Sequence, residues 1–172
     1  MSVKWIIWGV CLLMFIMNCS KKSSPVVELR HFPITSLEEI ITQTGVEFDE
    51  QVTSDGNGSL KITAADSVVI QLFDVVDIDI EDARLLYRAQ IKTEGVAGQV
   101  FLEMWCGFKD KGEFFSRDLQ TPSTGTKDWS IEETFFFLKK GENPDNVRLN
   151  LVVQGTGIVW IDDIHLLKAP LE

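Results

Sequence analysis

Residues 99–108 have the sequence Gln-Val-Phe-Leu-Glu-Met-Trp-Cys-Gly-Phe, and this stretch indicates the fold. Successive side chains of a β-strand point to opposite faces. One face would carry Val100, Leu102, Met104, Cys106 and Phe108. The opposite face would carry Phe101, Glu103 and Trp105. The stretch therefore predicts a strand of an antiparallel sheet with one buried and one solvent-facing side.

The same alternation occurs in two further segments, Arg84–Thr93 and Val147–Gln154. Short runs rich in Val, Ile, Leu and Phe recur along the chain and are separated by turn residues, which is typical of an all-β sandwich or barrel. A capping-box pattern at residues 36–39 allows a short helical turn near residues 37–42. The acidic residues 74–82 predict an extended segment or a loop. The eight predicted strands are Val46–Phe48, Ser59–Thr63, Val68–Val75, Arg84–Thr93, Gln99–Phe108, Ser130–Leu138, Val147–Gln154 and Gly157–Leu167.

The chain resembles a known family in the order of four short motifs. These are Gly58-Ser59-Leu60-Lys61-Ile62, Tyr87-Arg88-Ala89, Gly125-Thr126-Lys127-Asp128-Trp129 and Gly157-Ile158-Val159-Trp160-Ile161-Asp162-Asp163-Ile164. Together they resemble the galactose-binding-like jelly roll of carbohydrate-binding modules of the family 4, 9 and 22 type. The resemblance covers residues 45–167. It implies a two-sheet antiparallel jelly-roll sandwich, a structural calcium ion in many relatives, and a ligand groove on the concave sheet or at its loop edge.

The first nineteen residues resemble a bacterial lipoprotein signal. Lys4 precedes an apolar run, Trp5–Met17, that ends at Asn18-Cys19. About 13 residues rise only ~20 Å as a helix, too little for a ~30 Å hydrocarbon layer, although a short anchor helix is the alternative. We therefore expect a signal peptide at residues 1–18, a lipidated Cys19 with its tether at residues 19–35, and a jelly-roll domain at residues 36–172.

The resemblance implies a palmitate-type acyl anchor at Cys19 and a place in the bacterial cell envelope. No acidic residue directly follows Cys19, which favours the outer membrane in a Gram-negative host. The formal charge of −10 argues against nucleic acid as a partner, because such binding needs Lys and Arg to neutralise phosphates. With Cys11 in the signal and Cys19 acylated, Cys106 would have no disulfide partner. We expect Cys106 to be a buried small apolar residue.

The family resemblance also implies where calcium would bind. In this fold the ion often connects the first strand and the following loop to the last strand, through carboxylate and carbonyl oxygens. The alternative is that one acid of the terminal pair faces solvent while the other accepts hydrogen bonds from loop amides. The matching positions here are Glu47, Asp49, Asp55, Asn57, Asp162 and Asp163.

A row of polar side chains on the outer sheet face suggests a glycan-binding surface. Flat aromatic rings stack on sugar C–H groups, and amide or charged side chains bind the hydroxyls. An ordinary polar outer face is the alternative. The predicted ligand residues are Arg88, Gln90, Glu103, Trp105, Arg148, Asn150 and Gln154.

Catalysis has little support in the sequence. The two histidines are His31, in the predicted tether, and His165, in the last predicted strand, so we expect no histidine-rich metal site. Glu132 and Glu133 would point to opposite faces of a strand and could not flank one glycosidic bond. We expect a non-catalytic binding module, with a glycan as the favoured ligand. The alternative is an accessory lipoprotein that docks onto another envelope protein through Phe114, Phe115 and the outward side chains of residues 135–137.

Overall fold

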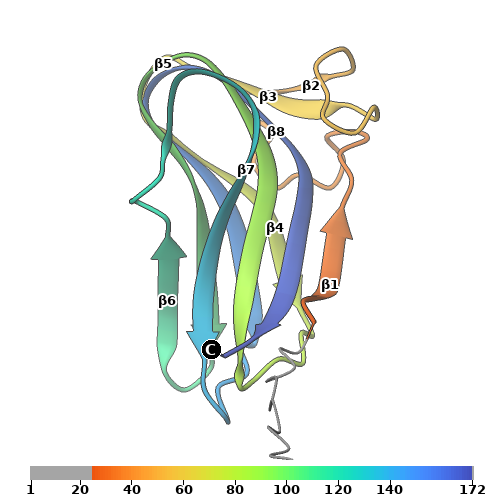
Figure 1. The fold of residues 1–172 in the computed structure, drawn as a ribbon, viewed down its shortest axis with the longest axis vertical. Coiled ribbons are helices and arrows are strands. Elements are labelled where there is room, and N and C mark those ends of the chain that lie inside the picture. Colours follow the sequence, from red (N-terminus) through yellow and green to blue (C-terminus); the bar gives the residue numbers. More distant parts are fainter. Residues whose placement is uncertain (1–24, 172) are drawn as a thin grey trace, which may run out of the picture.

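The computed structural model describes residues 25–171, which form eight β-strands and no helix. The predicted signal peptide and Cys19 lie outside this range. Within the described part of the chain, no helix is long and apolar enough to cross a membrane. The strands, drawn in Figure 1, are β1 (Val27–Phe32), β2 (Val46–Asp49), β3 (Ser59–Ala64), β4 (Val68–Val76), β5 (Ala83–Phe108), β6 (Gly112–Arg117), β7 (Ser123–Leu138) and β8 (Asn146–Pro170).

The strands form an antiparallel sandwich in which two long strands run through both layers. Residues 83–94 of β5 pair with residues 158–170 of β8, and this first layer also contains β1, β2, β3 and most of β7. Residues 97–107 of β5 pair with residues 146–156 of β8, and this second layer is completed by β4 and β6. Figure 1 shows both long strands arching over one end of the molecule. The predicted two-sheet jelly roll is confirmed.

Glycines allow β5 and β8 to stay in contact where they pass between layers. A Cβ atom at Gly98 would lie 1.8 Å from the carbonyl oxygen of Gln154, and one at Gly155 would lie 2.1 Å from that of Ala97. Both glycines have positive φ angles, which residues with a Cβ rarely adopt. The sequence predicted two separate strands in each of these regions. In the structure β5 and β8 are each continuous, because the chain bends at this point and does not turn back.

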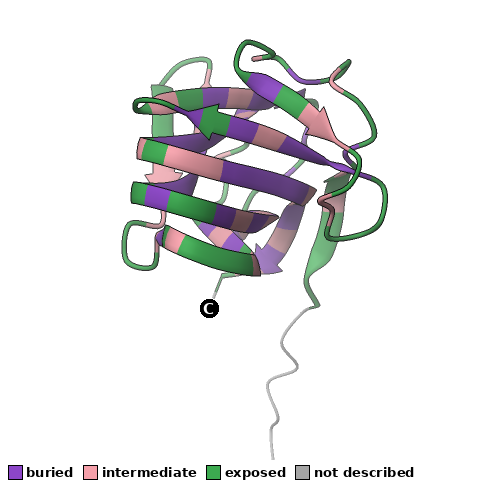
Figure 2. Ribbon diagram, turned by 90° about the horizontal axis from the view of Figure 1, so that it is seen from above, coloured by how far each residue is buried: buried purple, intermediate pink, exposed green. Residues whose placement is uncertain are grey.

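The core lies between the layers and is lined by the predicted inward faces. Leu85, Tyr87 and Ile91 of β5 are fully buried, as are Val147, Leu149 and Leu151 of β8. Figure 2 shows the resulting alternation of buried and exposed positions along the strands. Leu86 departs from the pattern, because it packs with Leu167 and Ala169 in a small cluster on the outer side of the first layer.

Three segments differ from the sequence-based prediction. The segment predicted as a tether, residues 19–35, contains β1, which pairs with β8 although its side chains are mostly exposed. Residues 112–117, which lie outside the predicted strands, form β6 and pair with β5. The capping-box segment forms a turn closed by the Ile40 N–H and the Leu37 carbonyl at 3.1 Å, without a helix. The acidic segment after β4 is a loop, as expected.

Candidate functional site

The structure divides the predicted ligand row between the two layers. In the second layer Glu103 lies opposite Asn150, and Trp105 lies opposite Arg148. Gln154 is exposed near the bend of β8. The other two predicted residues lie in the first layer, because β5 crosses over between them and Glu103. Arg88 lies opposite His165 there, and Gln90 lies opposite Asp162.

Glu103 organises the part of the row that lies in the second layer. Only 2% of Glu103 is exposed. Its Oε1 accepts hydrogen bonds from Trp105 Nε1 at 2.6 Å and from Asn150 Nδ2 at 2.8 Å. Its Oε2 forms an ion pair with Arg117 of β6. Three donors on three strands therefore share one buried carboxylate, and the indole of Trp105 is held in a fixed orientation.

Aromatic and cationic side chains flank the half-buried indole. The ring of Phe115 lies 4.9 Å from that of Trp105, centroid to centroid. The guanidinium carbon of Arg148 lies 5.6 Å from the Trp105 ring, within the range of a cation–π contact. Arg148 also forms an ion pair with Glu113 at 2.8 Å. Trp105 is thus positioned by its neighbours rather than left as an isolated surface residue.

A pocket of about 400 Å³ opens beside this group. Two side-chain atoms of its lining, Arg148 Nε and Asn150 Oδ1, have no hydrogen-bond partner among the described residues. The sequence analysis did not identify Thr42, Val69, Gln71 and Glu113 as part of this site. Thr42 lies in a loop, and the other three lie on β4 and β6, whose pairing with β8 and β5 cannot be read from the local sequence. The lining consists of Thr42, Val69, Gln71, Trp105, Glu113, Arg148 and Asn150.

The residues predicted to bind calcium do not all face one another. Asp162 is buried, and its Oδ2 accepts hydrogen bonds from the N–H and hydroxyl of Ser54, each at 2.7 Å. Asp163, by contrast, contacts His31 and His165. In the alternative given for Asp162 and Asp163, one acid accepts hydrogen bonds from loop amides. Asp162 does so, from the Ser54 N–H. Calcium binding itself stays a prediction.

The remaining calcium candidates have separate partners. Asp49 accepts hydrogen bonds from Trp160 Nε1 at 3.0 Å and from the Val52 N–H at 3.0 Å, and these bonds lower the pKa of its carboxyl. Asp55 accepts hydrogen bonds from the N–H and the side-chain amide of Asn57 at 2.8 and 2.9 Å. Burial raises the pKa of Asp55, but these bonds outweigh it and the pKa is lowered overall. Glu47 forms an ion pair with Lys61 at 3.9 Å.

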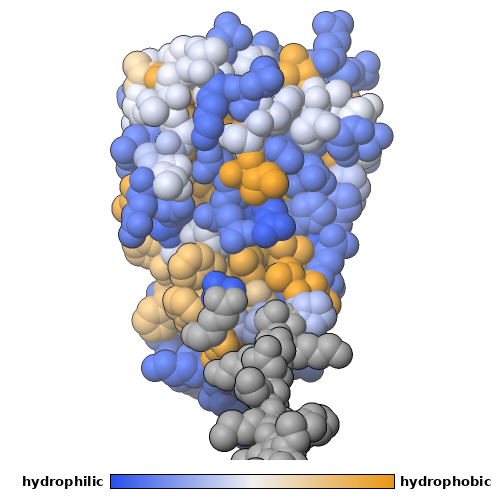
Figure 3. Space-filling model, viewed as in Figure 1, coloured by the Kyte–Doolittle hydropathy of each residue, from blue (hydrophilic) through white to orange (hydrophobic). Residues whose placement is uncertain are grey.

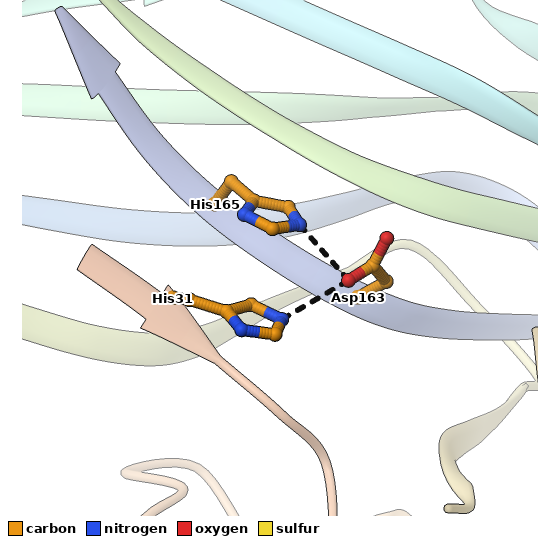
Figure 4. A group of neighbouring side chains, drawn as sticks. All are labelled: His31, Asp163 and His165. Carbon is orange, nitrogen blue, oxygen red and sulfur yellow. Dashed lines mark hydrogen bonds and ion pairs between the residues drawn. The ribbon is translucent and has the colours of Figure 1, made fainter. Parts of the chain in front are cut away.

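His31 and His165 meet because β1 pairs with β8. Their rings stack with centroids 4.2 Å apart, and Asp163 Oδ1 lies 3.0 Å from Nε2 of His31 and 2.9 Å from Nε2 of His165. Figure 4 shows both rings directed at this one oxygen. The sequence analysis placed His31 in a tether outside the domain. The structure shows instead that His31 belongs to β1 and lies opposite His165 of β8. Within residues 25–171, this is the one group of three or more His, Cys, Asp or Glu side chains with converging ligand atoms.

The residues considered for catalysis occupy structural positions. Glu132 is buried against Ser123, whereas Glu133 pairs with Arg88 on the other face of β7, as expected for neighbours in a strand. Cys106 is buried, as expected, and burial raises the pKa of its thiol to about 12. Its reactive thiolate form is therefore absent near neutral pH.

Comparison with solved structures assigns the fold. The family 22 xylan-binding module of Paenibacillus barcinonensis Xyn10C is 12% identical, with a TM-score of 0.59 over 84% of this chain and 96% of that one. The fold is the galactose-binding-like sandwich of carbohydrate-binding modules. A family 16 carbohydrate-binding module shares this jelly roll at 13% identity and a TM-score of 0.52, over 71% of this chain and 84% of that one.

A third solved structure with this jelly roll contains a bound sugar. It comprises the CBM22-1 and GH10 modules of Clostridium thermocellum xylanase 10B with xylohexaose. It is 11% identical to this chain, with a TM-score of 0.61 over 83% of this chain and 28% of that one. No protein-family model and no curated protein matches the sequence. At such low sequence identities, structural similarity shows the fold alone, so function has to be argued from the site.

Proposed function

We propose that this protein is a non-catalytic glycan-binding module whose ligand lies on the outer face of the second layer, against Trp105. The observation that carries the proposal is the fixed indole beside the pocket. Glu103 holds the ring edge, and the pocket-lining residues Asn150 and Arg148 each have a buried polar atom, Oδ1 and Nε, without a partner among the described residues. The carbohydrate-binding neighbours support the same ligand class.

The chemistry of the pocket suits a sugar chain. The part of the indole that stays exposed between Phe115 and Arg148 offers an apolar surface for C–H groups of a pyranose ring. The side-chain amide of Gln71 and the guanidinium of Arg148 offer hydrogen bonds to hydroxyls. Because the protein carries a net charge of −10, an uncharged glycan meets less electrostatic repulsion than an acidic one.

Titration of the full-length protein in detergent with a panel of neutral oligosaccharides tests this function. Calorimetry and tryptophan fluorescence should show saturable binding to at least one of them. Trp105→Ala and Gln71→Ala should each weaken it at least tenfold. Trp129→Ala is the matched control, because Trp129 lies on β7 outside the pocket and should leave affinity unchanged. Absence of binding across the panel, or equal affinity in the Trp105 variant, would overturn the proposal.

A second candidate function, docking onto another envelope protein, rests on the exposed apolar residues of β7. Ile131, Phe135 and Phe137 are 61%, 46% and 54% exposed. Figure 3 shows apolar side chains gathered over the lower ends of the first layer. On β6, Phe115 contacts Trp105 at the proposed glycan site, whereas Phe114 lies opposite Cys106 and packs edge-on against Phe108.

The two candidate functions can be separated by substituting β7. Changing Phe135 and Phe137 together to Ser should leave glycan affinity unchanged, because neither residue lines the pocket at Trp105. Photo-crosslinking from position 135 in cells should give a discrete adduct if docking occurs, whereas the same probe at Lys61, on β3, should not. Loss of glycan binding in the double variant would contradict the separation of the two surfaces.

We further propose that Cys19 carries an acyl anchor that holds the domain at the bacterial cell envelope. The support is the sequence of residues 1–19, with Lys4 ahead of a short apolar run and Cys19 at its end. Two or more acyl chains give stable membrane attachment. Mass spectrometry should find the mature chain beginning at an acylated Cys19, and metabolic labelling with palmitate should be lost in Cys19→Ala. An uncleaved, unmodified chain would refute the anchor.

A further inference from the structure

Two histidines and an aspartate from strands at opposite ends of the chain present their ligand atoms to one another. His31 comes from β1, and Asp163 and His165 come from β8. One ligand atom of each side chain lies within 4.8 Å of those of the other two, and Nε2 of each ring contacts Oδ1 of Asp163. We propose that these three side chains bind a divalent transition-metal ion of the zinc class, and that the ion connects β1 to the rest of the domain.

The geometry needs only small adjustments to admit such an ion. Zinc bonds of about 2.0–2.2 Å to nitrogen and oxygen in a tetrahedral site place neighbouring ligand atoms about 3.3–3.5 Å apart. The two observed Nε2–Oδ1 separations, 3.0 and 2.9 Å, are a few tenths of an ångström shorter. The stacked rings of His31 and His165 must also turn about their Cβ–Cγ bonds so that both lone pairs meet at one point, and the exposed ring of His31 has solvent beside it.

Glu28 supplies the outer contact that metal-binding histidines commonly have. Its Oε2 lies 2.9 Å from Nδ1 of His165. When Nδ1–H donates to this carboxylate, Nε2 has a free lone pair on the side of Asp163. Glu28 is therefore a positioning residue rather than a ligand, and it belongs to the same strand as His31.

The donor set selects the class of metal. Two imidazoles and one carboxylate suit zinc and its first-row neighbours, whereas calcium takes six to eight oxygen ligands. The side chains of His31 and Asp163 are 37% and 32% exposed, which gives an ion a path of entry and leaves room for water as a fourth ligand. An ion coordinated in this way would connect β1 to β8.

Because the cluster lies between β1 and β8, a bound ion would affect how β1 is attached to the domain. β1 is six residues long, and its one strand partner in the described chain is β8. His31 lies opposite His165 in that pairing, so a bound ion would join the two strands near the C-terminal end of β1. Metal binding should therefore hold β1 against the domain.

Titration with Co²⁺ and Zn²⁺ tests the site, using full-length protein in detergent and without a polyhistidine tag. We expect one ion per chain, visible ligand-field absorption from Co²⁺ that Zn²⁺ abolishes, and a rise in melting temperature by mass action. His31→Gln and His165→Gln should each weaken binding at least tenfold. Asp163→Asn should do the same, and because Asn also tolerates the positive φ angle at this position, the backbone should stay intact.

Further variants distinguish coordination from a general loss of structure. Glu94→Gln is the matched control, since Glu94 is an exposed acid of β5 opposite Ile158, away from the histidines, and it should leave metal affinity unchanged. Glu28→Gln should weaken binding less than either histidine substitution. Hydrogen exchange of β1 amides should slow when Zn²⁺ is added to the wild type and not when it is added to His31→Gln. Absence of binding at millimolar metal, or equal binding by the histidine variants, would overturn the proposal, whatever the outcome of the glycan titrations.

Discussion

Glu103 of β5 and Arg117 of β6 form an ion pair whose carboxylate is buried while its guanidinium lies against two aromatic rings. The guanidinium carbon of Arg117 is 5.4 Å from the centroid of Phe101 and 4.9 Å from that of Phe115. The same carboxylate binds Trp105 and Asn150. The ion pair thus connects the edge strand β6 to the residues of the proposed glycan site.

Glu103→Gln should lower the free energy of unfolding by about 2–3 kcal/mol, because it leaves the largely covered Arg117 without its counter-charge. Urea denaturation measures this loss. Glu133→Gln is the control, since its pair with Arg88 is more exposed and should be worth about 0–1 kcal/mol. Equal losses in the two variants would show that the buried pair has no special role.

Gly98→Ala should be severely destabilising, by about 3 kcal/mol or more, because the new Cβ would overlap the carbonyl of Gln154. Gly125→Ala provides the comparison. Gly125 also has a positive φ angle, but its Cβ would meet nothing within 4 Å, so the cost should be about 1 kcal/mol of backbone strain. Thermal melts of both variants give the difference, and a Gly98 variant as stable as the Gly125 variant would contradict the close contact of β5 and β8.

Tyr87→Phe should leave stability unchanged or raise it by about 1 kcal/mol. The Tyr87 hydroxyl is buried in the core without a hydrogen-bond partner among the described residues, and burial raises the pKa of this phenol far above its usual value. Removing an unpaired polar atom removes its desolvation cost. Chemical denaturation measures the change, and a clear loss of stability would mean that the hydroxyl has a partner, such as an ordered water.

The hydrogen bond between Trp160 and Asp49 predicts a specific acid sensitivity. It is the largest of the interactions that hold the pKa of Asp49 below the ordinary aspartate value of 3.8. A carboxyl with a lowered folded-state pKa contributes stability above pH 3.8 and loses that contribution as the pH falls through its folded-state pKa.

Trp160→Phe should therefore lower stability most above pH 5, and the difference from the wild type should shrink below pH 3.8. Denaturation midpoints measured between pH 6 and pH 3 check the effect. A difference that does not vary with pH would assign the loss to packing of the ring rather than to Asp49.

Calcium removal tests the prediction that rests on family resemblance. If Glu47, Asp49, Asp55, Asn57, Asp162 and Asp163 include calcium ligands, added Ca²⁺ should raise the melting midpoint by mass action. Asp49→Asn and Asp55→Asn should reduce the rise, and EGTA should abolish it. The same midpoint in Ca²⁺ and in EGTA would exclude the ion from this position.

Much of the sandwich could be predicted from the sequence, because burial of one sheet face imposes a period of two. Val100, Leu102 and Met104 show this pattern and lie in the core. The strand β1 gave no such signal, since its side chains are exposed or half-buried on both faces and its pairing with β8 decides its place. A strand held by backbone pairing leaves little trace in local hydrophobicity.

The candidate site was predicted in part for the same reason. Alternation placed Glu103, Trp105, Arg148 and Asn150 on an outer face, and cross-strand register brings them together. It could not show that the bend at Gly98 separates them from Arg88 and Gln90. Nor could it show that Gln71 joins the pocket or that His31 meets His165, because these contacts depend on which strands become neighbours.

The passage of β5 and β8 through both layers has a consequence for how the molecule comes apart. Neither layer can unfold independently of the other, because β5 and β8 each contribute one half of their length to each layer. We expect the domain to lose its structure in one all-or-none step, with no half-sandwich surviving. Genetic division of the chain at residue 95 or 156 should accordingly yield two fragments, neither of which keeps a core of its own.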